Sequence, residues 1–496
     1  MTRSLVWVQY KIMMSEVSSG KKKPNFDYGF IDVGRHYDGS PRSYQLRHRL
    51  GCLGGLRQAE VLWETGVYEP SRLPGNPLFE YILTIIYPLG GYISSNLFVL
   101  VMFGLSIFAF WQLVKEEINN MVLVSIFALT PILLVNAVTT LDYIPGLACL
   151  ILSYLYATKK NYILTSLFLG LAIGFRLSNA FVLVSLILFF VLNRDKISKI
   201  FFFSILSLGI GLIFYLPIFI RYRFEMFNIP TSLLWHNPVL YWERTIYNLI
   251  LLFGPIATIG IILIFLINRS NILQSLKKDL KGKSPIFIFK GATLILFLLL
   301  FFRHSDETAY LIPIIPFFYL LIAHWLSKRQ LILVGILIFS SAFLGLQIKR
   351  SERWGITLKP VWGTVIEDYL MRKELEYLRE GIAKINLPNK VVILTGLGPQ
   401  LTYKNNWLVE AKKEDLTEDL EPNGISGPIF RIKNREIFLV HSVSLENAIR
   451  LQKGGYGLYM FSFYAPGVAI HKYHYDPYQL GIKELKITGR DAFYRR

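Results

Sequence analysis

Several ionisable and hydroxyl-bearing side chains stand where apolar stretches of this chain end. They are Asp142 in NAVTTLDYIPG, Arg176 in GLAIGFRLSNA, Arg72 in EPSRLPGNP, and Arg303, His304, Glu307 and Tyr310 in RHSDETAYLIP. Arginine stays charged and binds phosphate oxygens bidentately. A carboxylate accepts a hydroxyl proton or holds a divalent metal. These residue types together indicate chemistry on a phosphate-bearing substrate.

Several of these residues also have a structural explanation. Asp142 suits the N-cap of the helix that follows it. Arg303 and His304 could extend from a helix end to lipid headgroups, and Arg72 could anchor its segment at the interface. Arg176 lies between two apolar runs, where a charge is costly, so function is favoured for it.

The composition requires a membrane environment for most of the chain. Apolar residues make up 53% of the 496, charged residues only 18%, and the mean hydropathy is +0.41. A transmembrane helix needs about 20 mainly apolar residues. The sequence predicts a polytopic α-helical membrane protein with about ten spans. These are residues 94–114, 119–136, 141–157, 160–176, 177–193, 199–220, 244–266, 287–302, 307–325 and 329–346. Residues 76–90 are predicted to form a helix in the interface.

The net charge of +19 predicts orientation rather than nucleic-acid binding, because Lys and Arg fall mainly in one set of alternate loops. That set includes Lys159, Lys160 and Lys199 and is predicted to be cytoplasmic. The loops around Asp142 and Arg303 then face outward, at the cell membrane. The two cysteines cannot form a disulfide framework.

Four regions follow from these patterns. Residues 1–55 are atypical and are expected not to be the native start; residues 56–92 form an outer loop with interfacial helices. Residues 93–348 are the transmembrane domain, and 349–496 a small extracytoplasmic α/β domain. In the last region we expect a helix over 365–385, strands over 391–395, 437–440 and 458–463, and a helix over 445–453.

The segments LRQAEVLWETGVYEPSRLPGNPLFEYIL, TTLDYIPG, GLAIGFR and RHSDETAYLIPIIPF resemble the GT-C superfamily of membrane glycosyltransferases. Protein O-mannosyltransferases and the aminoarabinose transferase of lipid A belong to it. The resemblance covers residues 55–346. It implies that Arg72, Arg176, Arg303 and His304 contact a lipid phosphate. It also implies that Asp142 is a second acidic group of the site, which could lie near a metal, and that Glu69 or Glu307 could assist.

One feature of the family is missing. Its members begin with a transmembrane helix and then an acidic pair that supplies the catalytic base, about a dozen residues before Thr65–Gly66. This chain has LGCLGG over 50–55 and no acid there. Either the chain is a catalytically degenerate member, or residues 1–55 are not the native start, and the second explanation is favoured. Asp38 or Asp32 could stand in as the base, although their spacing does not favour them.

These patterns predict a glycosyltransferase that moves a sugar from a polyprenyl-phosphate donor to a lipid, glycan or protein acceptor on the outer face. Membrane lipids are its other expected partners, nucleic acid is not one, and a divalent metal could join the site. The rival predictions are a non-catalytic membrane scaffold and a transporter or flippase of lipid-linked glycans. A transporter would carry charges deep in several spans and two symmetric halves, and the sequence shows neither.

Overall fold

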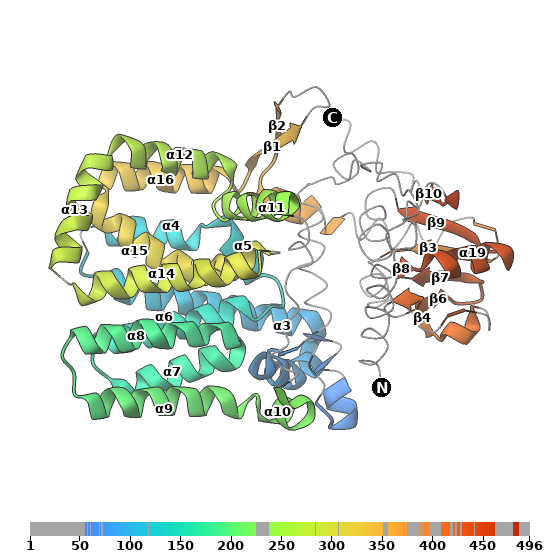
Figure 1. The fold of residues 1–496 in the computed structure, drawn as a ribbon, viewed down its shortest axis with the longest axis horizontal. Coiled ribbons are helices and arrows are strands. Elements are labelled where there is room, and N and C mark those ends of the chain that lie inside the picture. The colour runs from blue at the N-terminus through green and yellow to red at the C-terminus, as the bar shows by residue number, and fades with distance from the viewer. Residues whose placement is uncertain are drawn as a thin grey trace, which may run out of the picture.

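The computed structural model describes most of residues 55–373 and separate stretches beyond them. The described residues are 55–224 except 57, 60, 69, 71, 72 and 118; 238–373 except 283, 306, 351–355 and 371; and 387–388, 390–395, 408–416, 420–421, 424–426, 429–440, 442–461 and 480–485. Figure 1 shows the helices side by side, with their connections at two opposite ends.

Helices form because an apolar chain must satisfy its backbone hydrogen bonds internally. In chain order they are α3 (Pro77–Val114), α4 (Asn120–Ala128), α5 (Pro131–Ala137), α6 (Tyr143–Thr158), α7 (Tyr162–Phe175), η1 (Leu177–Ala180), α8 (Phe181–Leu192), α9 (Ile197–Ile213), α10 (Leu216–Tyr222), α11 (Pro238–Leu251), α12 (Pro255–Ile267), α13 (Arg269–Lys281), α14 (Pro285–Arg303), η4 (Thr308–Ile314), α15 (Ile315–Trp325) and α16 (Lys328–Ser340). Several begin at a proline, whose missing N–H is not needed in the first turn.

Apolar helices of this kind could span a membrane. Among the described residues, 3 helices are long and apolar enough to do so, or up to 6 if each bent pair is one span. The helices Tyr143–Thr158, Tyr162–Phe175 and Leu177–Leu192 are apolar but shorter. Nine of the ten predicted ranges overlap one of these helices or a bent pair. The tenth, residues 329–346, overlaps α16, which is not among them, so the number of spans stays a prediction.

The bends fall where the sequence places proline or glycine. Helices α4 and α5 meet at 57°, just before Pro131, and Tyr241–Leu251 meets α12 at 83° around Gly254 and Pro255. Within α3, Gly90 and Gly91 leave the helical conformation, and Gly91 has a φ of 61° that favours glycine. The break separates the predicted interfacial helix, residues 76–90, from the predicted span over 94–114.

The last predicted span ends earlier than expected. Residues 329–346 were predicted to be one span, but α16 ends at Ser340 and the strand β1 (Leu344–Arg350) begins four residues later. β1 pairs antiparallel with β2 (Ile356–Trp362), starting from Leu344 opposite Trp362. Strand pairing therefore satisfies backbone groups that a longer helix would have satisfied.

Aromatic rings fill the centre of the helical bundle. The ring of Tyr154 on α6 stacks on Phe289 of α14, with centroids 4.2 Å apart, and meets Phe317 of α15 edge-on at 5.7 Å. All three side chains are buried. Offset and edge-to-face pairs suit the quadrupoles of the rings, so this cluster holds α6, α14 and α15 together.

Helices α7 and α9 approach each other closely through small residues. Gly170 and Gly174 of α7 face α9, and Ser207 and Gly211 of α9 face α7. A Cβ built on Gly211 would lie 2.6 Å from Cγ2 of Ile173. Both helices carry the small-xxx-small spacing that lets membrane helices pack backbone to backbone.

The C-terminal part contains a six-stranded sheet of order β10-β9-β3-β7-β6-β4 with its own hydrophobic core. The strands are β3 (Val391–Leu394), β4 (Leu408–Ala411), β6 (Ile429–Ile432), β7 (Ile437–Val440), β9 (Gly457–Phe461) and β10 (Lys483–Leu485); β5 (Ile425–Ser426) pairs with β8 (Ser442–Val443) outside it. Helix α19 (Leu445–Lys453) connects β7 to β9, and both of these strands lie parallel to β3. The predicted strand–helix–strand unit is therefore present. The sequence analysis missed β4, β6 and β10, and part of the predicted helix over 365–385 lies outside the described residues.

Candidate functional site

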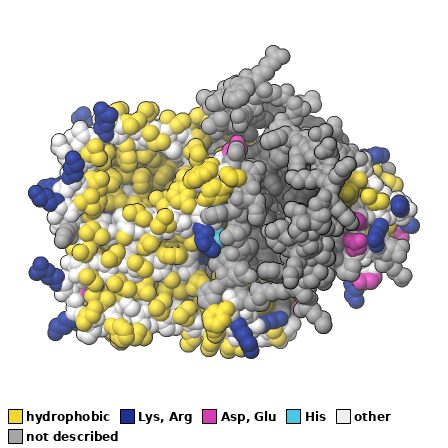
Figure 2. Space-filling model, in the orientation of Figure 1, with side chains coloured by type: hydrophobic (Ala, Val, Ile, Leu, Met, Phe, Trp, Pro, Cys, Tyr) yellow, Lys and Arg dark blue, Asp and Glu magenta, His cyan; other side chains and the backbone are white. Residues whose placement is uncertain are grey.

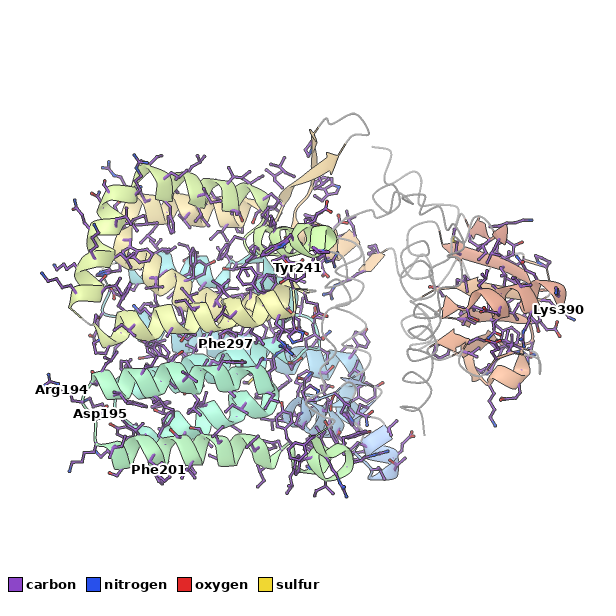
Figure 3. All side chains as sticks on the ribbon, viewed as in Figure 1. Arg194, Asp195, Phe201, Tyr241, Phe297 and Lys390 are labelled. Carbon is purple, nitrogen blue, oxygen red and sulfur yellow. The ribbon has the colours of Figure 1, made fainter. Side chains whose placement is uncertain are left out.

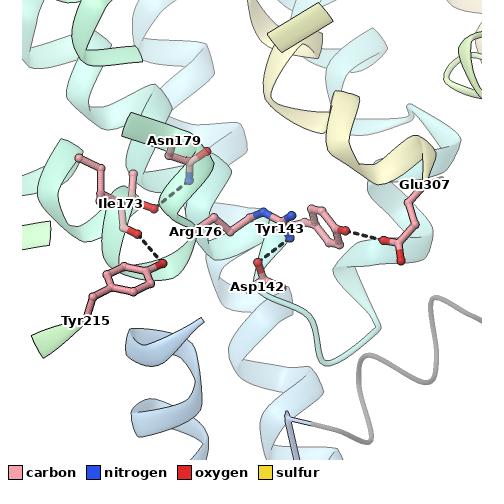
Figure 4. A network of polar contacts seen from close by, with 8 residues as sticks. Asp142, Tyr143, Ile173, Arg176, Asn179, Tyr215 and Glu307 are labelled. Carbon is pink, nitrogen blue, oxygen red and sulfur yellow. Dashed lines mark hydrogen bonds and ion pairs between the residues drawn. The ribbon is translucent and has the colours of Figure 1, made fainter. Parts of the chain in front are cut away.

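Asp142 and Arg176 form a buried ion pair at one end of the bundle (Figure 4). Arg176 Nη1 donates to Asp142 Oδ2 at 2.7 Å, and the two residues are 7% and 2% exposed. Asp142 precedes α6, but its side chain makes no capping bond to the helix. The capping explanation is therefore wrong for this carboxylate, which instead compensates the charge of Arg176.

Arg176 also contacts two aromatic rings. Its guanidinium lies 3.9 Å from the ring centroid of Tyr143 and 5.3 Å from that of Tyr310. The Tyr143 hydroxyl donates to Glu307 Oε2 at 2.7 Å. Ion pair, cation–π contacts and hydrogen bond therefore connect α6, the end of α7 and the segment after α14 into one network.

The segment 303–310 brings four of the predicted residues to this network. Arg303 ends α14 with an exposed side chain, and the ring of His304 lies 6.4 Å from that of Tyr310. Asn248 of α11 fixes the segment: its Nδ2 donates to the Ser305 carbonyl at 2.6 Å, and its Oδ1 accepts from the Thr308 hydroxyl at 3.1 Å. Cationic, aromatic and acidic side chains thus share one short, anchored turn.

Arg244 was not ranked as a site residue from the sequence, although the structure gives it an unusual position. It is 6% exposed, and its Nη2 is buried with no hydrogen-bond partner among the residues that the structure describes. On α11 it lies between Tyr241, which donates to the Phe302 carbonyl, and Asn248, which binds Ser305. This spacing places Arg244 on the face of α11 that packs against residues 302–308. The signal available in the sequence was a single arginine in the run VLYWERTIYNLIL.

Glu80 is a second residue that the sequence analysis missed. It lies in the first turn of α3, is 1% exposed, and accepts a short hydrogen bond from the Tyr68 hydroxyl. Burial, and then the neighbouring Glu80 carboxylate, raise the pKa of Tyr68 well above its ordinary value. The phenol therefore stays protonated and remains a donor. Tyr215, which is buried, donates to the Ile173 carbonyl at 3.2 Å, three residues before Arg176.

The structure thus brings together Asp142, Arg176, His304, Glu307 and Tyr310, with Arg303 next to His304 in the chain. Arg72 and Asp38 lie outside the described residues, as do Asp32, Glu69 and Asp306. Within the described part of the chain, no group of three or more His, Cys, Asp or Glu side chains is arranged to hold a metal ion.

Comparison with known proteins identifies no relative. No family model, curated protein or solved structure matches the chain.

Proposed function

We propose that this protein is a membrane glycosyltransferase that takes a sugar from a polyprenyl-phosphate carrier. The observation that carries the proposal is the buried Asp142–Arg176 pair, joined through Tyr143 to Glu307 at one end of an apolar bundle. Charges at membrane depth are costly and are usually retained for function. The resemblance to GT-C glycosyltransferases supplies the reaction class.

The cations of the site divide into those that bind the phosphate and one, Arg176, that holds other side chains in place. Arg303 is exposed and stands beside His304 at the end of α14, where a phosphate at the membrane surface would arrive. Arg244 is buried and has a guanidinium nitrogen that no hydrogen bond satisfies. Arg176 is already paired with Asp142, so its role is to hold that carboxylate and the Tyr143 ring in place. In this proposal Arg303, His304 and Arg244 bind the phosphate, and Arg72 joins them from the first outer loop.

The reaction needs one base and a stabilised leaving group. The acceptor hydroxyl oxygen attacks the anomeric carbon, the bond from that carbon to the phosphate oxygen breaks, and a carboxylate takes the hydroxyl proton. Asp142 and Glu307 are the carboxylates of the network. The carrier leaves as a phosphate whose additional negative charge is stabilised by the cations. The acceptor is a lipid, glycan or protein.

In the full proposal the chain crosses the cell membrane about ten times, and both the site and the C-terminal α/β region face outward. The support is the separation of charge. Lys and Arg side chains gather at one end of the helices (Figure 2). Asp142 precedes α6, whereas Lys159 follows the other end of that helix.

A non-catalytic scaffold remains the second candidate, because Asp142 and Arg176 neutralise each other and could serve packing alone. Binding of the carrier lipid distinguishes the glycosyltransferase from the scaffold. We would measure binding of a polyprenyl monophosphate to the purified protein in detergent, with the unphosphorylated polyprenol as reference.

The informative variant is Arg244→Met. Removing a buried donor without a partner should leave the free energy of unfolding unchanged or raise it by about 1–3 kcal/mol. The same change should weaken binding of the phosphorylated lipid roughly tenfold or more, as expected for a lost charge-assisted contact. Arg269→Gln, an exposed change on α13 at the lysine-rich end, is the matched control and should change neither quantity. A protein that binds the polyprenol and its phosphate equally well would favour the scaffold.

A further inference from the structure

A groove of about 580 Å³ lies at the lysine-rich end of the bundle, far from the site described above. It is formed where α6 turns into α7 and where α9 begins. Figure 3 labels Arg194, Asp195 and Phe201 at this end, and Tyr241 at the opposite one. The residues that line it are Lys159, Lys160, Asn161, Tyr162, Ile163, Ser198, Lys199 and Phe202. We propose that this groove binds the headgroup of an anionic phospholipid.

The charge in the groove is only partly compensated. Lys160 Nζ is paired with Asp195 Oδ1 at 3.1 Å, which offsets one of the three lysines. The ammonium of Lys159 lies 5.7 Å from the ring centroid of Tyr156, and that of Lys199 lies 5.3 Å from that of Tyr162. In the part of the chain that the structure describes, neither Lys159 nor Lys199 has a carboxylate partner. The groove therefore presents net positive charge.

The backbone adds to this field. Helix α9 begins at Ile197 without a side-chain cap, and α7 begins at Tyr162 with only one amide capped, that of Leu164 by Asn161. Helix N-termini carry partial positive charge and free N–H groups, which favour an anion. The uncapped start of α9 lies beside Ser198 and Lys199, so a phosphate held by the lysines would also face these amides.

The groove is open to the lipid side of the bundle as well as to its end. Ile163 is 63% exposed, and Phe202 on α9 is 51% exposed. Exposed apolar side chains continue along α9 with Phe201 and Ile205, and Figure 2 shows hydrophobic side chains covering the bundle between its two ends. A headgroup among the lysines would therefore leave its acyl chains against Phe202 and Ile163. This combination fits a phospholipid better than a soluble anion.

Other lysines at this end lack these features. Lys277 and Lys278 on α13 are exposed on a helix with no buried residue, and no groove residue comes from α13. They provide a matched control of the same charge at the same end of the molecule. The inference rests on the helices spanning a bilayer and is independent of the proposed sugar transfer.

Native mass spectrometry of the full chain in detergent, with phosphatidylglycerol added, tests this inference. Phosphatidylcholine with the same acyl chains is the reference lipid. The double variant Lys159→Gln/Lys199→Gln should weaken phosphatidylglycerol binding roughly thirtyfold, as expected for two juxtamembrane lysine charges. Lys277→Gln/Lys278→Gln should leave binding within about twofold, and Lys159→Arg/Lys199→Arg should retain it.

The Lys159→Gln/Lys199→Gln variant would also lose binding if it failed to fold, so a second variant that is expected to gain binding is needed. Asp195→Asn removes the partner of Lys160 and should strengthen phosphatidylglycerol binding several-fold. Three outcomes would overturn the proposal. One is an equal loss of phosphatidylglycerol binding in Lys277→Gln/Lys278→Gln. The others are equal binding of phosphatidylcholine and unchanged phosphatidylglycerol binding in Asp195→Asn. Displacement of the lipid by millimolar inorganic phosphate would also overturn it, because the groove would then be a site for a soluble anion.

Discussion

At the scale of single residues, the central interaction is the one between Asp142 and Arg176. Each side chain compensates the charge of the other in an apolar environment, and the centroid of the Tyr143 ring lies 3.9 Å from the guanidinium. Such a pair contributes little net stability, but losing one partner leaves a buried charge alone.

Removal of one partner should therefore cost more than removal of both. We expect Arg176→Met to lower the free energy of unfolding by about 3–5 kcal/mol, because the Asp142 carboxylate stays buried and unpaired. The double variant Asp142→Asn/Arg176→Met should recover a large part of that loss. Denaturant unfolding in detergent measures both. If the double variant lost as much stability as Asp142→Asn alone and Arg176→Met alone added together, the two residues would not be coupled.

The residue types of the site could be predicted from the sequence, but their pairing could not. Asp142 and Arg176 are 34 residues apart, and Tyr143 and Glu307 are 164 apart, so only the packing of α6 against α7 and of η4 against α6 brings them together. Arg244 and Glu80 were harder to find, since a single charge in an apolar run gives no sign of whether it is buried and unpaired.

At the scale of elements, α7 and α9 pack closely through their glycines. Gly170 and Gly174 lie one turn apart in GLAIG, and a Cβ on Gly174 would lie 2.6 Å from Cδ2 of Phe214. This packing sets the direction of α7 and hence where Arg176 leaves it. A change at these glycines should therefore reach the site.

Two glycines on α9 allow a matched comparison. Gly211→Ala should destabilise the protein by about 1–3 kcal/mol, because the new methyl group would overlap Ile173. Gly209→Ala, two residues away with nothing within 4 Å of its Cβ position, should be neutral or stabilise by roughly 0.5–1 kcal/mol through helix propensity. Thermal unfolding of both variants in one detergent is the measurement. Similar melting temperatures would show that α7 and α9 are not in close contact.

Most elements could be predicted from apolar length and from proline and glycine, because both act locally. The strand β1 could not. Its sequence LGLQIKR continues the apolar run of α16, and only its pairing with β2 decides the conformation. Strands β4 and β6 are four residues each and depend in the same way on partners distant in sequence.

At the scale of the whole molecule, the direction of the chain between α13 and the C-terminal sheet can be tested without knowing the total number of spans. Helix α14, the η4–α15 segment and α16 each run from one end of the bundle to the other. If all three cross a membrane, as proposed, Lys278 and the sheet lie on opposite sides of it.

Cysteine labelling in intact cells measures this arrangement. In a background of Cys52→Ser and Cys149→Ala, we expect Lys433→Cys to react with a membrane-impermeant maleimide. Lys278→Cys should react only after permeabilisation. Labelling of both from the same side would exclude a membrane crossing by all three segments, and the reverse pattern would invert the proposed orientation.

If α6 and α7 cross a membrane, as proposed, their shortness has a consequence for the bilayer itself. With 16 and 14 residues they extend roughly 24 and 21 Å, against a hydrocarbon thickness of about 30 Å. A bilayer around them must thin, or their ends must lie below the headgroup plane. If the lysines at the other end hold that side at the bilayer surface, as proposed, the mismatch falls on Asp142 and Arg176. The carboxylate–guanidinium pair then sits at the floor of a local depression, which a lipid phosphate reaches by sliding sideways and a water-soluble acceptor reaches only from above.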